Sequence, residues 1–352
     1  MVDWTKSMGV TYEYYLVDPN TWENTRKLDF VKNSNISRDH SSETRGSATI
    51  EVTKLVGECY VREYLVTIQN GVTERHPLGT HLVQSPSSGF DGKVKSVTLD
   101  AYTPLLELKE KFPPIGYSLL KGDNIMEKAY QIVRENVRAP VVRANCDITL
   151  DYDFVANPGD TWVTFVAELI ANAKYELGLD ELGRVIFLPK QDTAALQPVW
   201  TYTAGNASIL HPEITMDHDL YGIPNVVEVI YSNGMDSYYA KVINDDPNSP
   251  TSIVNRGRVI PHIDTNPSLV GNATEYQVKE YARQLLKEMS TVEYTISYTH
   301  GYCPTRVGDC VRLDVPEAGL NGVKARVISQ SIGCKTECSV KEKAVYTTTL
   351  WG

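Results

Sequence analysis

The first hundred residues alternate apolar and polar side chains in short runs separated by turn-forming residues. Runs such as TYEYYLV, SATIEVT and CYVREYLVTIQ place every second side chain on one face, as half-buried strands do. Asn70-Gly71 stands between two such runs and predicts a hairpin, and Asp91-Gly92 indicates another. Several short strands at this spacing predict a β-barrel-like domain over residues 1–104.

The period of the pattern changes between residues 105 and 200. Apolar side chains recur every three or four residues in two segments: Ile125, Ala129, Ile132, Val133 and Val137 in the first, and Trp162, Phe165, Val166, Leu169 and Ile170 in the second. Asp123 and Asp160 stand where N-terminal caps of these two helices are expected. The run DELGRVIFLP then predicts a small hairpin around residues 181–183, so this range is expected to form a small α/β domain.

Strand patterns return over residues 201–352 and predict a second β-barrel-like region. One helix is expected within it, at about residues 274–289, with its buried face formed by Val278, Tyr281, Ala282, Leu285 and Leu286. The predicted fold class is therefore α+β, mainly β. Two β-barrel-like domains flank a small α/β domain, and a helix lies within the C-terminal β region.

Composition narrows the classes of function. The 352-residue chain has a net charge of −10 and no segment that concentrates lysine and arginine, so sequence-specific nucleic-acid binding is not expected. Apolar runs are too short to span a membrane, and no signal-peptide pattern opens the chain, so we expect synthesis in the cytoplasm. The 21 tyrosines, against 6 phenylalanines, suit half-buried strands and wet assembly interfaces.

Four of the six cysteines fall close together near the C-terminus: Cys303, Cys310, Cys334 and Cys338. If the strands from Val292 onward form a meander, the turns at 301–309 and 333–339 meet at one end of the sheet. Four thiolates there could hold zinc or an iron–sulfur cluster, although the spacing is not a standard zinc-finger pattern. The alternatives are a Cys334–Cys338 disulfide and unligated thiols that serve as packing residues.

Catalytic motifs are missing from the sequence. The run MDHDLYG places Asp217 and Asp219 on one side of a strand and His218 on the other, which a solvated strand edge explains. The sequence contains no HExxH, GxSxG, phosphate-binding loop or GxGxxG pattern. We therefore expect a protein that is not an enzyme.

The order of motifs in the last third of the chain is specific. The helix ending ARQLLKEMS is followed by a strand, by PTRVGDCVRL at 304–313, by GVKARVIS at 322–329 and by a last strand. This order resembles the hub protein at the tip of bacteriophage tails, a family that includes the baseplate hub of contractile tails and related injection machines. The segment 161–189, TWVTFVAELIANAKYELGLDELGRVIFLP, is similar to the family's middle domain.

The resemblance implies a structural role at the tail tip of a virion. Three copies form a ring, and the two barrel-like domains of each copy line the end of the tail tube and mimic its sixfold symmetry. The ring joins the distal tail protein ring to a central tail fibre or spike, meets the C-terminus of the tape-measure protein, and forms part of the DNA ejection conduit. Some tail-tip proteins of long-tailed phages carry a four-cysteine iron–sulfur cluster, which favours that interpretation of the cysteines. The alternative function is a carbohydrate-binding or adhesin module of a phage or bacterial surface, acting as a monomer.

Overall fold

A computed structural model describes residues 2–90, 95–205, 208–234, 236–269 and 273–352. Contacts divide the chain into two compact units. Unit 1 comprises Met1–Ile214 and Ser297–Ala344, and unit 2 comprises Thr215–Ile296 and Val345–Gly352. The three-domain division expected from the sequence stays a prediction, because contact density does not show which segments fold independently.

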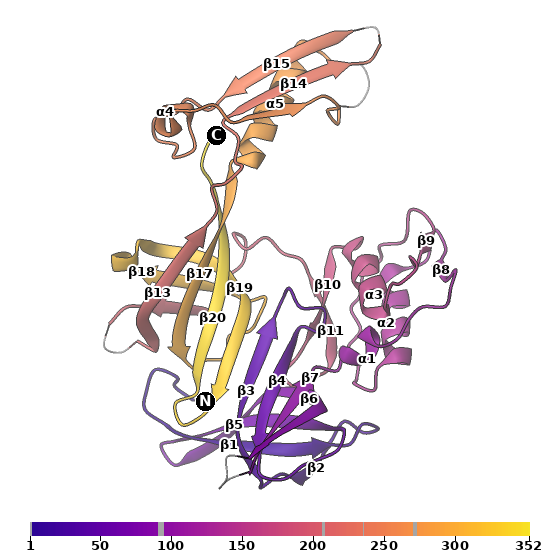
Figure 1. Cartoon of the computed structure of the whole chain (residues 1–352), viewed down its shortest axis with the longest axis vertical. Helices are drawn as coiled ribbons and strands as arrows, with labels where there is room; N and C mark the ends of the chain where they lie inside the picture. The colour runs from indigo at the N-terminus through magenta and orange to yellow at the C-terminus, as the bar shows by residue number, and fades with distance from the viewer. Residues whose placement is uncertain (1, 91–94, 206–207, 235, 270–272) are drawn as a thin grey trace. The chain divides into compact units, whose positions relative to one another are not determined.

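Strands make up 46% of the chain and helices 14%, so the fold is α+β and mainly β, which confirms the predicted class. Figure 1 labels the elements. The strands are β1 (Gly9–Val17), β2 (Asn24–Lys27), β3 (Val31–Asp39), β4 (Gly46–Val52), β5 (Cys59–Gln69), β6 (Val72–Phe90), β7 (Lys95–Tyr102), β8 (Ser118–Leu119), β9 (Phe154–Val155), β10 (Tyr175–Leu179), β11 (Val185–Pro189), β12 (Trp200–Thr203), β13 (Leu210–His218), β14 (Val226–Ser232), β15 (Ser237–Ile243), β16 (Pro261–Asp264), β17 (Thr291–Gly301), β18 (Cys310–Val315), β19 (Leu320–Cys334) and β20 (Ser339–Thr349). The helices are α1 (Leu106–Lys109), α2 (Ile125–Asn136), α3 (Trp162–Ala171), α4 (Ile253–Arg256) and α5 (Glu275–Met289), with a 3-10 turn at Pro316–Ala318.

Seven strands form the first β region, in the order β3-β4-β7-β6-β5-β1-β2. The alternating side chains of these strands bury one face, as the sequence pattern predicts; on β4 the inward residues include Ala48, Ile50 and Val52. The predicted hairpin at Asn70-Gly71 is confirmed, since both residues have the positive φ angles (51° and 77°) that a tight turn between β5 and β6 requires. β6 and β7 also pair antiparallel, but Asp91-Gly92 lies outside the described residues.

The second β region continues the same sheet through β19. Residues 329–334 of β19 pair with residues 34–39 of β3, and the order beyond is β19-β20-β17-β13. β18 pairs with the first part of β19, and β12 pairs with β18. The predicted meander of the last four strands is wrong: β17 pairs with β13 and β20, whereas β18 pairs with β12 and β19. Side-chain alternation encodes a strand but not its neighbour, and the last strand of the chain inserts between β17 and β19. Among the described residues the pairings do not close either region into a barrel.

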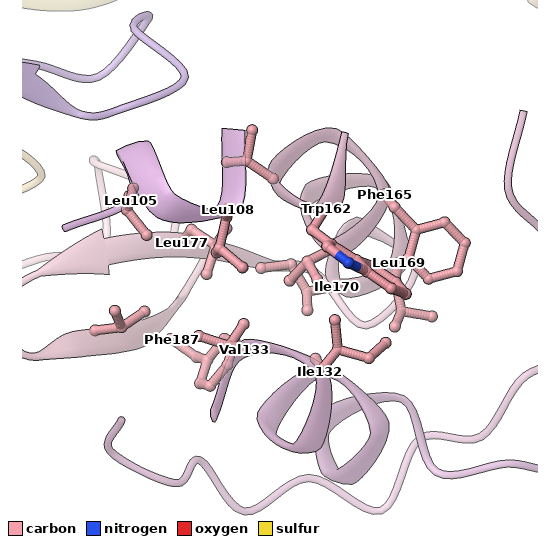
Figure 2. Packing of buried hydrophobic residues seen from close by; sticks show 14 of the residues in the cluster. Leu105, Leu108, Ile132, Val133, Trp162, Phe165, Leu169, Ile170, Leu177 and Phe187 are labelled. Carbon is pink, nitrogen blue, oxygen red and sulfur yellow. The ribbon is translucent and has the colours of Figure 1, made fainter. Parts of the chain in front are cut away.

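The helices of the α/β insert pack around a core that Tyr60 and Leu82 of the first β region also join. α2, α3 and the β10–β11 hairpin bury the predicted apolar stripes, including Ile132, Val133, Leu169 and Ile170. Figure 2 shows Ile132 and Val133 of α2 facing the side chains that α3 contributes. Each fully buried side chain of this kind stabilises the fold by about 1.5–3 kcal/mol relative to exposure.

Both predicted helix caps are wrong by one residue. Asn124 caps α2 and Thr161 caps α3, because in each case the side-chain oxygen accepts the backbone N–H of the third helical residue, at 2.9 Å and 3.3 Å respectively. The predicted caps act in the preceding turns. The carboxylates of Asp123 and Asp160 each accept a backbone N–H from three residues earlier, at 3.0 Å and 2.7 Å.

Unit 2 is built on a three-stranded sheet in the order β15-β14-β16. α5 packs on one face of this sheet and confirms the helix predicted at about 274–289 (Figure 1). The contact buries Val227, Val229, Tyr231 and Ala240 of the sheet against Val278, Ala282 and Leu286 of the helix. Thr274 and Gln277 form a capping box at the start of α5, which satisfies two N–H groups that the helix leaves unpaired.

Candidate functional site

A buried cluster of polar side chains lies in the second β region of unit 1, around Glu342 of β20. Strands β12, β17 and β19 and the segment between β17 and β18 supply its other members. The members of this Glu342 cluster are Tyr202, Tyr298, His300, Cys303, Thr305, Gln330 and Glu342, each at most 3% exposed. Such a concentration of buried polar groups is costly unless the groups satisfy one another.

The Glu342 carboxylate is fully engaged. Its Oε2 accepts hydrogen bonds from Gln330 Nε2 at 2.6 Å and from Thr305 Oγ1 at 3.1 Å, and lies 3.5 Å from His300 Nε2. Its Oε1 accepts hydrogen bonds from the hydroxyls of Tyr298 and Tyr202. Both oxygens therefore find donors, as a buried charge requires.

Electrostatics makes this cluster a buried ion pair at neutral pH. Burial raises the pKa of Glu342. The hydrogen bond and positive charge of His300 lower it, as do hydrogen bonds from Gln330 and Tyr298, and together they hold the pKa of Glu342 below its ordinary value. Burial alone lowers the pKa of His300, yet interactions with Cys303 and Glu342 raise it to about 10. The imidazolium and the carboxylate therefore stabilise each other's charged form.

The cluster brings together the residue types of a nucleophilic site but shields them. Cys303 Sγ lies 3.8 Å from His300 Nδ1, and His300 faces Glu342, an order that resembles a nucleophile, its base and an orienting carboxylate. A nucleophile must reach its substrate, and the Cys303 side chain is 1% exposed. The role that this geometry supports is structural, because the hydrogen bonds join four strands to the segment that follows β17.

The sequence contains a signal for this cluster that motif searching does not detect. On β20, Val340, Glu342 and Ala344 share the inward face, and Tyr298 and His300 are likewise two residues apart on β17. A glutamate at an inward position between two small apolar residues indicates a buried partner. The partner itself, His300, is 42 residues away and is identified only by the strand pairing.

The four candidate metal ligands lie in three surroundings. Cys303 belongs to the Glu342 cluster, and Cys310 begins β18 with its sulfur 3.9 Å from the carbonyl oxygen of Thr193. Cys334 and Cys338 lie in the apolar core of the first β region. Burial raises the pKa of the Cys334 thiol well above its ordinary value and that of Cys338 to about 11.

The register of β18 on β19 separates Cys310 from Cys334. Cys310 faces Arg326 on β19, eight residues before Cys334 on the same strand, which is roughly 26 Å at about 3.3 Å per residue. The two turns do meet, since Tyr302 N donates to the Cys338 carbonyl oxygen at 3.1 Å, but Cys310 is separated from Cys334 along β19. In the part of the chain that the structure describes, no group of three or more His, Cys, Asp or Glu side chains could hold a metal ion. The zinc or iron–sulfur group, like the Cys334–Cys338 disulfide, stays a prediction for chemical analysis.

The segment MDHDLYG lies at the end of β13. Asp217 and His218 are exposed, the His218 ring stacks on Tyr294 with centroids 4.5 Å apart, and the Asp219 carboxylate accepts the N–H of Tyr221 at 2.7 Å. β13 is the last strand of its sheet. These contacts fit the interpretation of the segment as a solvated strand end.

The insert is bound to the first β region through the turn of its hairpin. The carbonyl oxygen of Leu182 accepts hydrogen bonds from Trp22 Nε1 at 2.8 Å, Thr80 Oγ1 at 2.9 Å and the Arg62 guanidinium at 3.2 Å. Gly183 follows with φ of 73°, and a Cβ there would lie 2.7 Å from the Cβ of Thr80. The turn thus needs glycine both for its backbone and for its close approach to β6.

Comparison with known proteins finds similarity in structure rather than in sequence. No family model and no curated protein matches the chain. A tail protein from Neisseria meningitidis MC58 superimposes with a TM-score of 0.61 at 14% identity, covering 96% of this chain and 97% of its own. The 43 kDa tail protein of prophage MuSo2 from Shewanella oneidensis has a TM-score of 0.60 at 12% identity, with 96% and 98% covered. A chain of the Francisella PdpA-VgrG complex has a TM-score of 0.52 at 10% identity; the match spans 98% of this chain and 53% of that one.

Sequence identities of 10–14% carry no residue roles from these proteins to this chain. They do identify the architecture, because the first two matches extend over nearly the whole of both chains. Within the described residues, no helix combines the length and the hydropathy needed to cross a membrane.

The structural matches show that the chain has the fold of bacteriophage tail proteins, which confirms the resemblance that the order of its C-terminal elements indicates.

Proposed function

We propose that this chain is a structural hub of a phage tail tip or baseplate. In this proposal three copies form a ring that closes or extends the tail tube and links the distal tail ring to a central fibre or spike. The observation that carries the proposal is the match to two tail proteins over 96% of this chain and 97–98% of theirs. The whole chain, rather than one module of it, is accounted for by a tail protein fold.

The sheet supports assembly into a ring. Each chain carries two β regions joined through β19 and β3, so three chains supply six such regions around a tube. β13 and β2 stand at the two ends of the main strand order, and most side chains of β13 are exposed. Edge strands offer unpaired backbone groups, and a head-to-tail contact between unlike edges closes into a ring when the rotation permits.

The charge of the chain supports a place in a DNA conduit. At a net charge of −10, the ring repels the phosphate backbone instead of holding it. DNA then passes without a strong binding site along its path. The distal tail ring, the C-terminus of the tape-measure protein and the fibre or spike are the proposed neighbours.

Two measurements test the hub. Light scattering of the chain alone is expected to give three times the 39.3 kDa mass of one chain, and with the proposed neighbours a complex that contains three copies of it. Imaging of whole virions should locate three copies around the tail axis. A lysine in place of Met216, which is 42% exposed on β13, should lower the trimer fraction, whereas Val254→Lys on α4 should not. A chain that stays monomeric with its neighbours present and lies away from the tail axis would contradict the proposal and favour the adhesin alternative.

A further inference from the structure

Two segments of the insert form an irregular antiparallel ribbon. β8 pairs with β9 through Ser118↔Val155 and Leu119↔Phe154, and the contact continues where Lys121 N donates to Asp153 Oδ1 at 2.8 Å. A bridge between residues 124 and 149 ends it. Residues 117–125 and 148–156 are called here the insert ribbon. Figure 1 shows β8 and β9 together, on the side of α2 and α3 away from β10.

The two faces of the insert ribbon have different surroundings. Leu119 and Leu150 on the inner face are buried, and the Phe154 ring packs against Phe165 of α3 with centroids 5.0 Å apart. The outer side chains, together with the turn that leads into the ribbon, form the ribbon patch: Ile115 (108% exposed), Leu120 (62%), Ile148 (45%), Tyr152 (80%) and Val155 (54%). The inner face explains the fold of the ribbon, but nothing in the fold requires apolar residues on the outer face.

Aspartates border the ribbon patch along the chain. Asp147, Asp151 and Asp153 are exposed on the ribbon or next to it, and Lys121 is the one lysine within residues 115–123 and 147–155. Asp123, the other carboxylate of these ranges, pairs with Lys128 of α2 at 3.4 Å. The patch therefore combines an apolar centre with a negatively charged border.

We propose that the ribbon patch is a docking surface for a basic, amphipathic segment of another protein. Five large apolar side chains are exposed on the ribbon and the turn before it, and exposed apolar surface of this kind often marks an interaction site. The acidic border selects a partner that carries lysine or arginine beside its apolar residues. A second copy of this chain is disfavoured, because it would bring the same aspartates on a chain of net charge −10. The proposal concerns the insert alone and does not rest on the hub function.

The test uses the full chain and a synthetic probe. A fluorescent peptide with leucine on one face and lysine on the other is titrated and followed by anisotropy, beside a matched peptide with glutamate in place of lysine. The lysine peptide should bind, the glutamate peptide should not, and raising NaCl from about 0.05 M to about 0.5 M should weaken binding several-fold. Hydrogen exchange should slow within residues 117–125 and 148–156 when the lysine peptide is present.

Variants distinguish peptide binding at the ribbon patch from non-specific attraction of a basic peptide to an acidic protein. The double variant Tyr152→Ser, Val155→Ser should weaken binding about tenfold, because it removes two apolar contacts at solvent-exposed positions that the fold does not need. Tyr276→Ser, at a 72% exposed position on α5, is the matched control and should bind the peptide as the parent does. Equal affinity of the parent and the double variant, or self-association of the chain through the patch in light scattering, would overturn the proposal.

Discussion

Replacing Glu342 with glutamine tests the buried ion pair directly. The substitution keeps the size of the side chain and removes the charge that faces His300 Nε2 at 3.5 Å. The donors of Gln330 and Tyr298 then face an amide instead of a carboxylate, and His300 loses the partner for its positive charge. Removing one partner of a buried pair costs about 3–5 kcal/mol, and we expect a loss of that size in the free energy of unfolding of unit 1.

The pH dependence provides an independent magnitude. Folding raises the pKa of His300 from its ordinary 6.5 to about 10, and a shift of that size corresponds to roughly 5 kcal/mol. A raised pKa means that this contribution is complete below about pH 6.5 and is lost as the pH rises through 10. The pKa of Glu342 is lowered, so its own contribution is present above its ordinary 4.5 and is lost as the pH falls through the lower folded value.

The assay is urea unfolding between pH 6 and pH 10, with hydrogen exchange of residues 297–301 of β17 and 339–344 of β20 to report on unit 1 separately. The parent should lose stability across this range, and Glu342→Gln should be less stable at pH 6 and change less with pH. Glu337→Gln, an exposed position just before β20, is the control and should stay within about 0.5 kcal/mol of the parent. If Glu342→Gln unfolds at the same urea concentration as the parent at pH 6, the ion pair does not stabilise the fold and the reasoning fails.

Four further predictions concern other parts of the chain. Gly183→Ala should destabilise the contact of the insert hairpin by about 1–3 kcal/mol and speed hydrogen exchange of β10, whereas Gly116→Ala, with positive φ but open space, should cost less; equal effects would contradict the clash with β6. Leu286→Ala, at a fully buried position of α5, should cost about 2–5 kcal/mol and speed exchange in unit 2 only, and protection lost equally in unit 1 would refute separate units. The Cys338 thiol, with its pKa raised to about 11, should react slowly with a disulfide reagent at pH 8 until the chain unfolds, and rapid reaction in the folded chain would contradict its burial. Iron and zinc analysis of the chain purified without oxygen tests the four-thiolate prediction, which requires a metal centre that Cys303→Ser abolishes.

Local patterns predicted the elements well because each depends on neighbouring residues. The alternation around Asn70-Gly71 specified a hairpin, and the stripe from Val278 to Leu286 specified α5. The sequence places both caps one residue early, since aspartate before a helix serves the preceding turn as readily as the helix itself. Pairings between distant strands leave no such local pattern, so the sequence does not predict the Glu342 cluster.

The sequence by itself determined the class of the protein: strands with a helical insert, an acidic chain without catalytic motifs, and an order of C-terminal motifs that resembles phage tail proteins. Only the tertiary structure decided which strands are neighbours, and with them which side chains meet. The insertion of β20 beside β17 brought Glu342 to His300, and the pairing of Cys310 with Arg326 took that thiol away from Cys334. The physical reason is that periodicity along a strand selects the buried face, whereas the neighbour of a strand is selected by packing and hydrogen bonding between segments far apart in the chain.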